Sequence, residues 1–368
     1  MSPEVRFNDL SVGGSAPAAE IEAAIARVLA SGWFILGPEV EAFEREIAEA
    51  FDCGWAVGVG NGTDAITLAL MALGIGPGDE VVTTPLTAAF TALAVSRLGA
   101  KPVFADVEPD TLTLSVESAE KHITAKTRAL MPVHLYGNAA DIEGMLELAR
   151  ERGIALVEDA CQAHGARQEG KFLGGLGRLG TFSFYPTKNL GALGDGGMVV
   201  TRDEELAVKL KRLRNGGQSS RYRHDEFGVN SRLDEIQAAI LRVRLRHLEA
   251  KNERRRELSR IYERALEGVP VRPVAVREGC TSARHLFVVR SAHRDALAAH
   301  LKERGIESLI HYPIPIHRMK AYASLGQEEG SCPNAERACG EILSLPLHPA
   351  LSPETVERVA DAIRAFRP

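Results

Sequence analysis

Residues 180–201, GTFSFYPTKNLGALGDGGMVVT, hold a lysine between two apolar segments. We predict a short buried strand first, then a turn that carries Lys188, then a second strand behind the glycines. Burial disfavours the ammonium form of a lysine, and the uncharged amine is a nucleophile that can form a Schiff base. The stretch therefore favours covalent chemistry at Lys188, although a surface lysine at a strand end, with the glycines in hairpin turns, would give a similar pattern.

Strands and helices are predicted to alternate before this stretch. Apolar segments predict strands at 80–83, 102–104, 129–133 and 154–157, and helical patterns at 87–98 and 141–152 lie between them. This alternation indicates an α/β fold whose sheet is mostly parallel and has helices on both faces. Ligands bind such sheets at the carboxyl ends of the strands. Asp159, just past the strand at 154–157, is therefore a ligand-binding candidate, unless it only caps the following turn.

The segment 55–74, WAVGVGNGTDAITLALMALG, predicts a buried strand that ends in glycines and leads into a helix capped by Thr63. The free N–H groups of a helix N-terminus favour phosphate binding. The glycine spacing is GxGxG, which matches neither the GxGxxG pattern nor a GK[ST] loop. A plain strand-to-helix turn remains an equal alternative from this segment alone.

The other helices and strands divide the chain into two predicted domains, a large cofactor-binding domain over 1–250 and a smaller α+β domain over 251–368. The polar, arginine-rich segment from 217 to 232 is expected to be an exposed functional loop. The remaining predictions are helices at 17–30, 38–51, 202–215, 233–266, 294–304, 335–343 and 353–366, and strands at 285–290 and 307–312.

Composition excludes several classes of protein. The chain has 368 residues, 45% hydrophobic and 25% charged, which is typical of a globular protein. Its net charge of −5 and pI near 6.2 do not favour nucleic-acid binding, and no apolar run reaches the roughly 18 residues of a membrane span. The N-terminus lacks a signal-peptide pattern, so we expect a cytoplasmic protein. Five cysteines without a CxxC pair argue against both a zinc site and a disulfide framework.

Four motifs occur in a fixed order along the chain: the Gly62–Thr63 helix start, Asp159 followed by Gln162, SFYPTKN around Lys188, and FGVNSRLDEIQAA at 227–239. Together they resemble the pyridoxal-phosphate sugar aminotransferases of fold type I, the DegT/StrS family, from about residue 8 to the C-terminus. Each motif alone is weak, but their joint occurrence by chance is improbable. The resemblance implies a large domain with a seven-stranded type of sheet between helices, and a smaller α+β domain.

The resemblance also implies roles for individual residues. Lys188 would form the Schiff base with pyridoxal phosphate and then transfer the proton between substrate and cofactor. Asp159 would pair with the pyridine nitrogen and keep it protonated, and Gln162 would hydrogen-bond the phenolic oxygen. Ser183 and the Gly62–Thr63 backbone would hold the phosphate.

Further implied roles concern the substrates and the second subunit. Asn230 of the partner subunit would reach the cofactor phosphate, which implies a homodimer with shared sites. The reaction would move an amino group, in this family most often from L-glutamate, to a keto group of a nucleotide-linked sugar, with pyridoxamine phosphate in the second half-reaction. Tyr312, His317 and Arg221 are candidate substrate-binding residues, and Arg223 and Arg232 are further candidates for holding the diphosphate.

One departure from the family pattern affects the cofactor ring. Many members have an aromatic residue in a TFxAT-like segment that stacks on the pyridine, whereas this chain has TAAFT at 87–91, with Ala88 at that position. Phe90 is an alternative from a shifted register, and Cys161 would by family position pack on the opposite face. The stacking residue is therefore unassigned.

Three other functions compete with amino transfer. A pyridoxamine-dependent sugar dehydratase of the same family typically has histidine in place of the lysine, so Lys188 argues against it. A non-catalytic regulator or sensor on the same fold would not need Lys188, Asp159 and Gln162 intact. A cysteine desulfurase or lyase would need a reactive thiol, and nothing in the sequence marks one.

Overall fold

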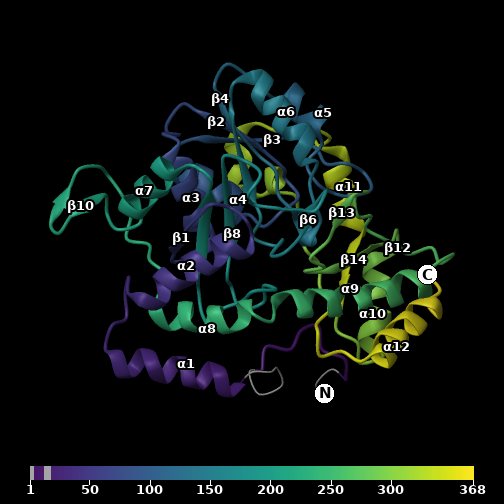
Figure 1. Cartoon of the computed structure of the whole chain (residues 1–368). Helices are drawn as coiled ribbons and strands as arrows, with labels where there is room; N and C mark the ends of the chain where they lie inside the picture. The colour runs from purple at the N-terminus through teal and green to yellow at the C-terminus, as the bar shows by residue number, and fades with distance from the viewer. Residues whose placement is uncertain (1–3, 12–17) are drawn as a thin grey trace.

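The computed structural model describes residues 4–11 and 18–368 of the chain (Figure 1). Seven strands form the central sheet, in the spatial order β1 (Trp55–Val59), β9 (Gly197–Thr201), β8 (Leu179–Ser183), β5 (Ala155–Asp159), β4 (Thr127–Met131), β2 (Glu80–Thr83) and β3 (Lys101–Phe104). Neighbours from β8 to β3 are parallel, whereas β9 is antiparallel to both β8 and β1. The four strands predicted between residues 80 and 157 are confirmed as β2, β3, β4 and β5, and their ends differ from the prediction by no more than two residues.

Helices cover both faces of this sheet, as predicted. One face packs against α3 (Gly62–Ala72), α4 (Phe90–Arg97) and α7 (Glu204–Leu213), and the other against α2 (Pro38–Ala50), α6 (Ile142–Arg152) and α8 (Glu235–Leu245). Successive residues of a strand point to opposite faces of the sheet. Val57 therefore packs on the side of α3, α4 and α7, and Ala56 packs on the side of α2, α6 and α8. Helix α1 (Ala18–Ser31) packs on the outside of α8.

The strands on either side of Lys188 are β8 and β9, which form an antiparallel pair with Ser183 opposite Gly197. A Cβ on Gly197 would lie 2.3 Å from the carbonyl oxygen of Asn61, so only glycine lets β9 pass this close to the start of α3. The connection from 184 to 196 begins at the carboxyl end of β8. Lys188 therefore lies at the same edge of the sheet as Asp159, the last residue of β5.

A separate core lies towards the C-terminus. It contains apolar residues of α9 (Leu248–Ala265), β14 (Phe287–Arg290), α10 (Arg294–Glu303), β15 (Ile342–Leu345) and α12 (Pro353–Arg364). Strands β12 (Arg272–Pro273), β14 and β15 form a small antiparallel sheet, and α11 (Pro333–Glu341) packs beside it. Val5 also packs in this core. The division of the chain at residue 250 remains a prediction.

The prediction of one long helix over 233–266 was wrong. The structure has two helices, α8 and α9, separated at Arg246 and His247. Neither glycine nor proline marks the break. Helix α8 buries Ile240 against α1, whereas α9 buries Leu258 in the C-terminal core. Helical periodicity continues through the break, so that only the packing of the two segments in different cores reveals it.

Two C-terminal predictions also need correction. No strand forms at 307–312, where only Leu309 makes an isolated bridge, to Ser344. The helix predicted to end at 343 ends at Glu341, because the residues that follow form β15 and pair with β14. The predicted loop at 217–232 carries a short hairpin. Other short segments are α5 (Val116–Lys121), β6 (Arg167–Gln168), β7 (Lys171–Phe172), β10 (Gln218–Ser220), β11 (Arg223–His224) and β13 (Cys280–Thr281).

Among the described residues, 4–11 and 18–368, no helix combines the length and the apolar character needed to cross a membrane.

Candidate active site

A cavity of about 630 Å³ lies at the carboxyl ends of the sheet strands, between α3, α4 and the connection after β8. Its lining combines a lysine, a buried carboxylate and the N-terminus of a helix. Seven of the ten residues predicted for the site line it: Gly62, Thr63, Asp159, Gln162, Ser183, Lys188 and Tyr312. The fold thus brings together residues that are up to 250 positions apart in the chain.

Lys188 lies in the turn that follows β8, where its backbone N–H donates a 2.8 Å hydrogen bond to the carbonyl of Tyr185. Burial lowers the pKa of Lys188 below its ordinary value, and the nearby Cys161 and Asp159 oppose this shift only in part. A larger fraction of the amine is therefore uncharged near neutral pH than for a surface lysine. This is the state that a nucleophilic amine requires.

Asp159 is 3% exposed and is held by two hydrogen bonds. Thr91 Oγ1 donates to its Oδ2 at 2.8 Å, and the backbone N–H of Cys161 donates to its Oδ1 at 3.2 Å. Neither bond neutralises the carboxylate, and no basic side chain among the described residues pairs with it. The charge therefore remains available for a cationic group in the cavity, such as a protonated ring nitrogen. The sequence analysis did not identify Thr91, because a threonine at a helix start has no distinctive pattern.

The N-terminus of α3 is capped by Asn61 and not, as predicted, by Thr63. The Asn61 side chain accepts a 2.9 Å hydrogen bond from the N–H of Asp64. The prediction was wrong by two residues because asparagine is at least as good a cap as threonine and the helix begins earlier, at Gly62. The N–H groups of Gly62 and Thr63 have no partner within the helix and remain available for an anion.

Ser183 lies directly against this helix start. A Cβ on Gly62 would be 2.6 Å from Ser183 Cβ and 3.3 Å from Cys161 Sγ. The absence of a side chain at Gly62 thus allows a hydroxyl and a helix N-terminus to converge. Such a combination suits a phosphate group.

Gln162 is fixed by two tyrosines. Its Oε1 accepts a 2.7 Å hydrogen bond from the N–H of Tyr136, and its Nε2 donates to Tyr312 Oη at 3.2 Å. Burial raises the pKa of Tyr312 to about 12, so its phenol is protonated near neutral pH. An amide nitrogen has two hydrogens, and the second is available to a ligand. Tyr312 follows His311, which also lines the cavity.

The residues discussed for contact with a ring all lie on the cavity wall. Ala88, Phe90 and Cys161 line it. Phe90 is 62% exposed, so its ring is only partly covered by this chain. Burial and the neighbouring Asp159 raise the pKa of the Cys161 thiol well above its usual range, which makes it a packing group and not a nucleophile.

His164 does not line the cavity. It is buried against the rings of Phe182 and Phe184, with centroid distances of 5.3 and 5.9 Å. Burial lowers its pKa to about 3, so it is a neutral core histidine. His164 therefore packs in the core and contributes no ligand-binding group to the cavity.

Three predicted site residues lie elsewhere. His317 is 3% exposed and its Nε2 is 2.9 Å from Glu336 Oε1, outside the cavity, so the prediction that it binds substrate there was wrong. Its nearness in sequence to Tyr312 was misleading because a short 3₁₀ helix at Ile316–Arg318 directs it into the core. Arg221 and Asn230 are exposed, on and after the β10–β11 hairpin, and do not line the cavity of their own chain. A role for them in a partner's site remains a prediction.

Besides His311, a second histidine, His285, lines the cavity. His285 is 7% exposed, and its Nδ1 is 3.1 Å from Asn189 Oδ1, in the residue after the lysine. Burial, with Lys188 nearby, lowers the pKa of His285 well below its ordinary value. The Asn189 amide also donates to Asn252 Oδ1 at 2.8 Å and to the carbonyl of Ala283 at 2.7 Å. These hydrogen bonds connect the turn that carries Lys188 to α9 and to the segment before β14. No sequence motif indicates them.

The residues present fit a phosphorylated pyridine aldehyde. The cavity offers a buried carboxylate for a ring nitrogen, a helix N-terminus with Ser183 for a phosphate, and a partly uncharged amine for an aldehyde. Its volume is within the range of small-molecule sites.

Comparison with known proteins agrees with this fit. Residues 16–364 match the model of the DegT/DnrJ/EryC1/StrS aminotransferase family. The chain belongs to this family. It is 50% identical over 366 residues to the dTDP-3-amino-3,4,6-trideoxy-alpha-D-glucose transaminase of Streptomyces venezuelae, covering 99% of this chain and 97% of that protein. Family membership confirms that the chain is a pyridoxal-phosphate-dependent aminotransferase.

Solved structures of family members share the fold of this chain. The S. venezuelae DesV structure, a complex with a ketimine intermediate, has a TM-score of 0.96 and 49% identity and covers 99% of this chain and 98% of that one. A family aminotransferase from Brucella abortus has a TM-score of 0.94 and 37% identity and covers 99% of both chains. These matches confirm the predicted fold type I architecture.

Proposed function

We propose that the enzyme moves an amino group from L-glutamate to the keto group of a sugar linked to a nucleoside diphosphate. The observation that carries the proposal is the Lys188 amine, with its lowered pKa, in one cavity with the carboxylate of Asp159. Relatives support the sugar substrate: proteins named as dTDP-sugar and UDP-sugar aminotransferases are 38–50% identical to this chain.

Each of these cavity residues has its own proposed role. Bound pyridoxal phosphate supplies an aldehyde for amine exchange and a ring that accepts electrons when a substrate C–H bond breaks. Lys188 would bind the aldehyde carbon of this cofactor, and its amine would take and return the proton of the substrate C–H bond. Asp159 would pair with the ring nitrogen, and the hydrogen bond from Thr91 orients that carboxylate. Gln162, held by Tyr136 and Tyr312, orients a ring oxygen.

We further propose that the site is completed by a second copy of the chain. Phe90 and Tyr185 line the cavity yet are 62% and 53% exposed. The β10–β11 hairpin extends away from the body of the protein (Figure 1) and carries the exposed residues Arg221 and Tyr222. A partner that covers the exposed aromatic rings and contributes Asn230 of the partner subunit would explain both features.

The test is the absorbance spectrum of the purified enzyme before and after excess L-glutamate. We expect a visible band from cofactor joined to Lys188, which glutamate replaces with absorption at shorter wavelength. Lys188→Ala should retain cofactor but lose turnover by at least about 10²–10⁴-fold, since no second lysine among the described residues lines the cavity. Unchanged turnover in Lys188→Ala would disprove the role of the lysine, and a band that glutamate leaves unchanged would point to another amino donor.

A regulatory function is the second candidate, because two relatives have regulatory names. They are the "sensory transduction protein" EryC1 of Saccharopolyspora erythraea, 47% identical, and the "pleiotropic regulatory protein" of Geobacillus stearothermophilus, 45% identical. The intact set of Lys188, Asp159 and Gln162 favours catalysis. Bound cofactor without turnover on any nucleotide-linked ketosugar would favour regulation.

A further inference from the structure

Helix α9 places an amide side chain in the protein core, and both of its hydrogen bonds go to loops of the candidate active site. Asn252 is 0% exposed and lies on the buried face of α9, in helical spacing with Leu248 and Ser259. A buried amide is unfavourable unless its polar atoms are hydrogen-bonded. The partners of Asn252 therefore show which parts of the molecule this polar residue holds together.

The Asn252 amide joins two loops that follow neighbouring strands of the central sheet. Its Oδ1 accepts a 2.8 Å hydrogen bond from Asn189 Nδ2, in the connection from 184 to 196 after β8. Its Nδ2 donates a 2.8 Å hydrogen bond to the carbonyl of His164, in the loop from 160 to 166 after β5. Among the residues that the structure describes, no other side chain is hydrogen-bonded to both loops.

Both loops carry groups that line the candidate active site. Lys188 immediately precedes Asn189, and its own N–H is bonded to the carbonyl of Tyr185 at 2.8 Å. Gln162 lies two residues before His164. Both Lys188 and Gln162 line the cavity. The bridge on α9 thus reaches each loop within two residues of a cavity side chain.

The Asn189 side chain is held in one orientation because all of its polar groups are bonded. Besides the bond to Asn252, its Nδ2 donates to the carbonyl of Ala283 at 2.7 Å, which uses its second hydrogen. Its Oδ1 is 3.1 Å from His285 Nδ1 and can only accept, so that nitrogen of His285 carries the proton. Lys188 is therefore followed by a side chain that three partners fix.

The close approach of α9 to the loop from 160 to 166 depends on a glycine. Gly165 has a φ of +82°, and a Cβ there would lie 2.8 Å from Asn252 Nδ2. A side chain at this position would push the amide away from the carbonyl of His164. The loop has no side chain at the point where the helix has a polar one, and a direct bridge requires both.

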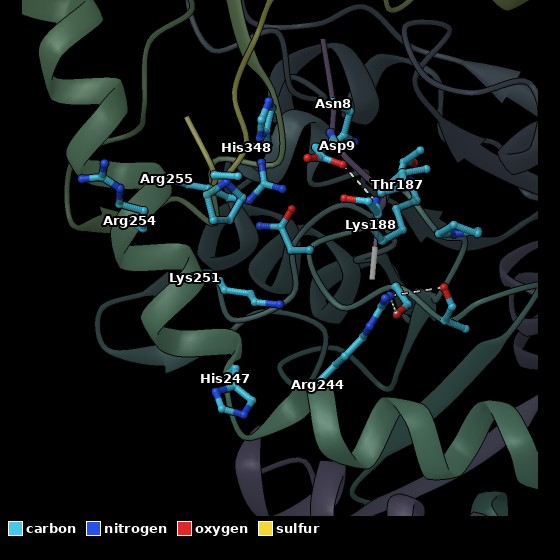
Figure 2. A pocket seen from close by; sticks show the side chains of 18 of the residues that line it. Asn8, Asp9, Thr187, Lys188, Arg244, His247, Lys251, Arg254, Arg255 and His348 are labelled. Carbon is cyan, nitrogen blue, oxygen red and sulfur yellow. Dashed lines mark hydrogen bonds between the residues drawn. The ribbon is translucent and has the colours of Figure 1, made fainter. Parts of the chain in front are cut away.

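The basic residues near Asn252 do not form such a bridge. Figure 2 shows a cavity of about 370 Å³ behind the turn that carries the lysine, with Arg244, Lys251 and Arg255 on its wall. Arg244, from α8, donates to the carbonyl of Gly191 at 2.6 Å, at the far end of the turn. Neither Lys251 nor Arg255 is hydrogen-bonded to the turn in the described part of the chain. Asn252 is thus the residue through which α9 holds it.

We propose that Asn252 is a positioning residue that acts through Asn189 to fix the backbone of Lys188, so that the lysine amine meets the substrate C–H bond in the orientation that proton transfer requires. Asn252 does not line the cavity and acts only through the two loops. A displacement of about 1 Å in a reacting group can lower a rate about 10²-fold. The alternative is that Asn252 only stabilises the packing of α9.

The test compares Asn252→Leu with Asn189→Ala, with the two changes combined, and with the control Leu258→Ala. Leucine has nearly the shape of asparagine and removes both hydrogen bonds. Asn189→Ala removes the bond between the two amides from the other side, so the test stands if Asn252→Leu does not fold. Leu258 lies on the same helix, in a core that contains no residue of either loop, and its truncation destabilises the protein there.

The first measurement is the rate of the half-reaction with L-glutamate, at saturating cofactor and well below each melting temperature. We expect a loss of about 10- to 100-fold in Asn252→Leu and in Asn189→Ala, and the wild-type rate in Leu258→Ala. The double variant should be no more than about threefold slower than the slower single variant, because both changes break one connection. Deuterium at Cα of glutamate should slow Asn252→Leu more than the wild type, since proton transfer becomes the slow step.

The second measurement needs no amino donor. The apo enzyme is titrated with pyridoxal, which has the aldehyde but no phosphate, and the visible band reports its reaction with Lys188. A fixed turn presents the amine to this aldehyde at a lower entropic cost than a loose one. We expect pyridoxal to bind at least about fivefold more weakly to Asn252→Leu, and as in the wild type to Leu258→Ala.

Three results would overturn the inference. They are wild-type rates in both Asn252→Leu and Asn189→Ala, a lowered rate with an unchanged isotope effect, and equal losses in Leu258→Ala, which would leave Asn252 a purely stabilising role. The first measurement takes L-glutamate as the donor and so rests on the proposed function. If that function fails, the wild-type enzyme does not react with glutamate, and the pyridoxal titration still decides the role of Asn252.

Discussion

The close contact between Gly62 and Ser183 leads to a quantitative prediction for Gly62→Ala. An alanine Cβ would lie 2.6 Å from Ser183 Cβ, whereas ordinary contact begins at 3.4 Å. Either α3 or the end of β8 must therefore move by at least about 0.8 Å. The backbone itself tolerates alanine, because Gly62 is the first residue of a helix and has no positive φ. Any effect of the substitution thus comes from the steric contact.

Overpacking of this kind costs about 1–3 kcal/mol. If the apo protein relaxes by moving Ser183 aside, the cost appears when the cofactor phosphate requires both groups in place. At 1.4 kcal/mol for each factor of ten, we expect pyridoxal phosphate to bind roughly 5- to 150-fold more weakly. The assay is titration of the apo enzyme with the cofactor, followed by visible absorbance, together with thermal unfolding of the apo form.

Two matched variants make the experiment decisive. Gly340→Ala, on the exposed side of α11, meets no atom within 4 Å and should stabilise the protein by about 0.5–1 kcal/mol without changing cofactor affinity. Gly62→Ala combined with Ser183→Gly removes the contact and should recover stability, but not the phosphate-binding hydroxyl. Wild-type cofactor affinity and melting temperature in Gly62→Ala alone would refute the reasoning.

Three other predictions concern buried polar groups. Thr91→Val removes the hydrogen bond to the Asp159 carboxylate, worth about 1.5–3 kcal/mol, and should lower turnover roughly 10- to 100-fold in steady-state assays while circular dichroism stays unchanged. Glu158→Ala leaves His134 and three backbone N–H groups without their acceptor and should destabilise the protein by about 3–5 kcal/mol in urea unfolding. His164 has a folded pKa of about 3, against about 6.5 when unfolded, so its contribution to stability is complete above pH 6.5 and is lost as pH falls towards 3. His164→Leu should flatten this acid limb by up to about 1.4 kcal/mol per pH unit; an unchanged slope would contradict the assignment.

Much of the central sheet and its helices could be predicted because their signals are local. Apolar runs of four or five residues, separated by helical patterns, are typical of a parallel sheet that is buried on both faces. The break between α8 and α9 could not be predicted, because the residues around His247 continue the helical pattern and the break depends on which core each segment joins. The same holds for Ile342 and Leu343, whose apolar character suits a helix end and a buried strand equally well.

The candidate site was predictable to the extent that its chemistry depends on residue types in ordered motifs. Asp159 ends a strand, and Gln162 and Lys188 each follow one. The carboxyl ends of parallel strands are where ligand-binding side chains gather. Thr91 and His285 were missed because their neighbours along the chain carry no sign of the partner they contact in space. His317 was wrongly assigned because a short helical turn separates it from Tyr312 and buries it.

The sequence by itself determined the class of this protein: an α/β fold with a lysine, an aspartate and a glycine-start helix in the order of a fold type I aminotransferase. These features depend on spacing within short segments. Only the tertiary structure decided which cations gather beside the turn that carries Lys188, because Arg244, Lys251 and Arg255 belong to helix faces that look like ordinary solvated surface in the sequence. Their proximity to residues near position 9 and position 348 depends on contacts between distant segments, and a one-dimensional pattern contains no information about those contacts.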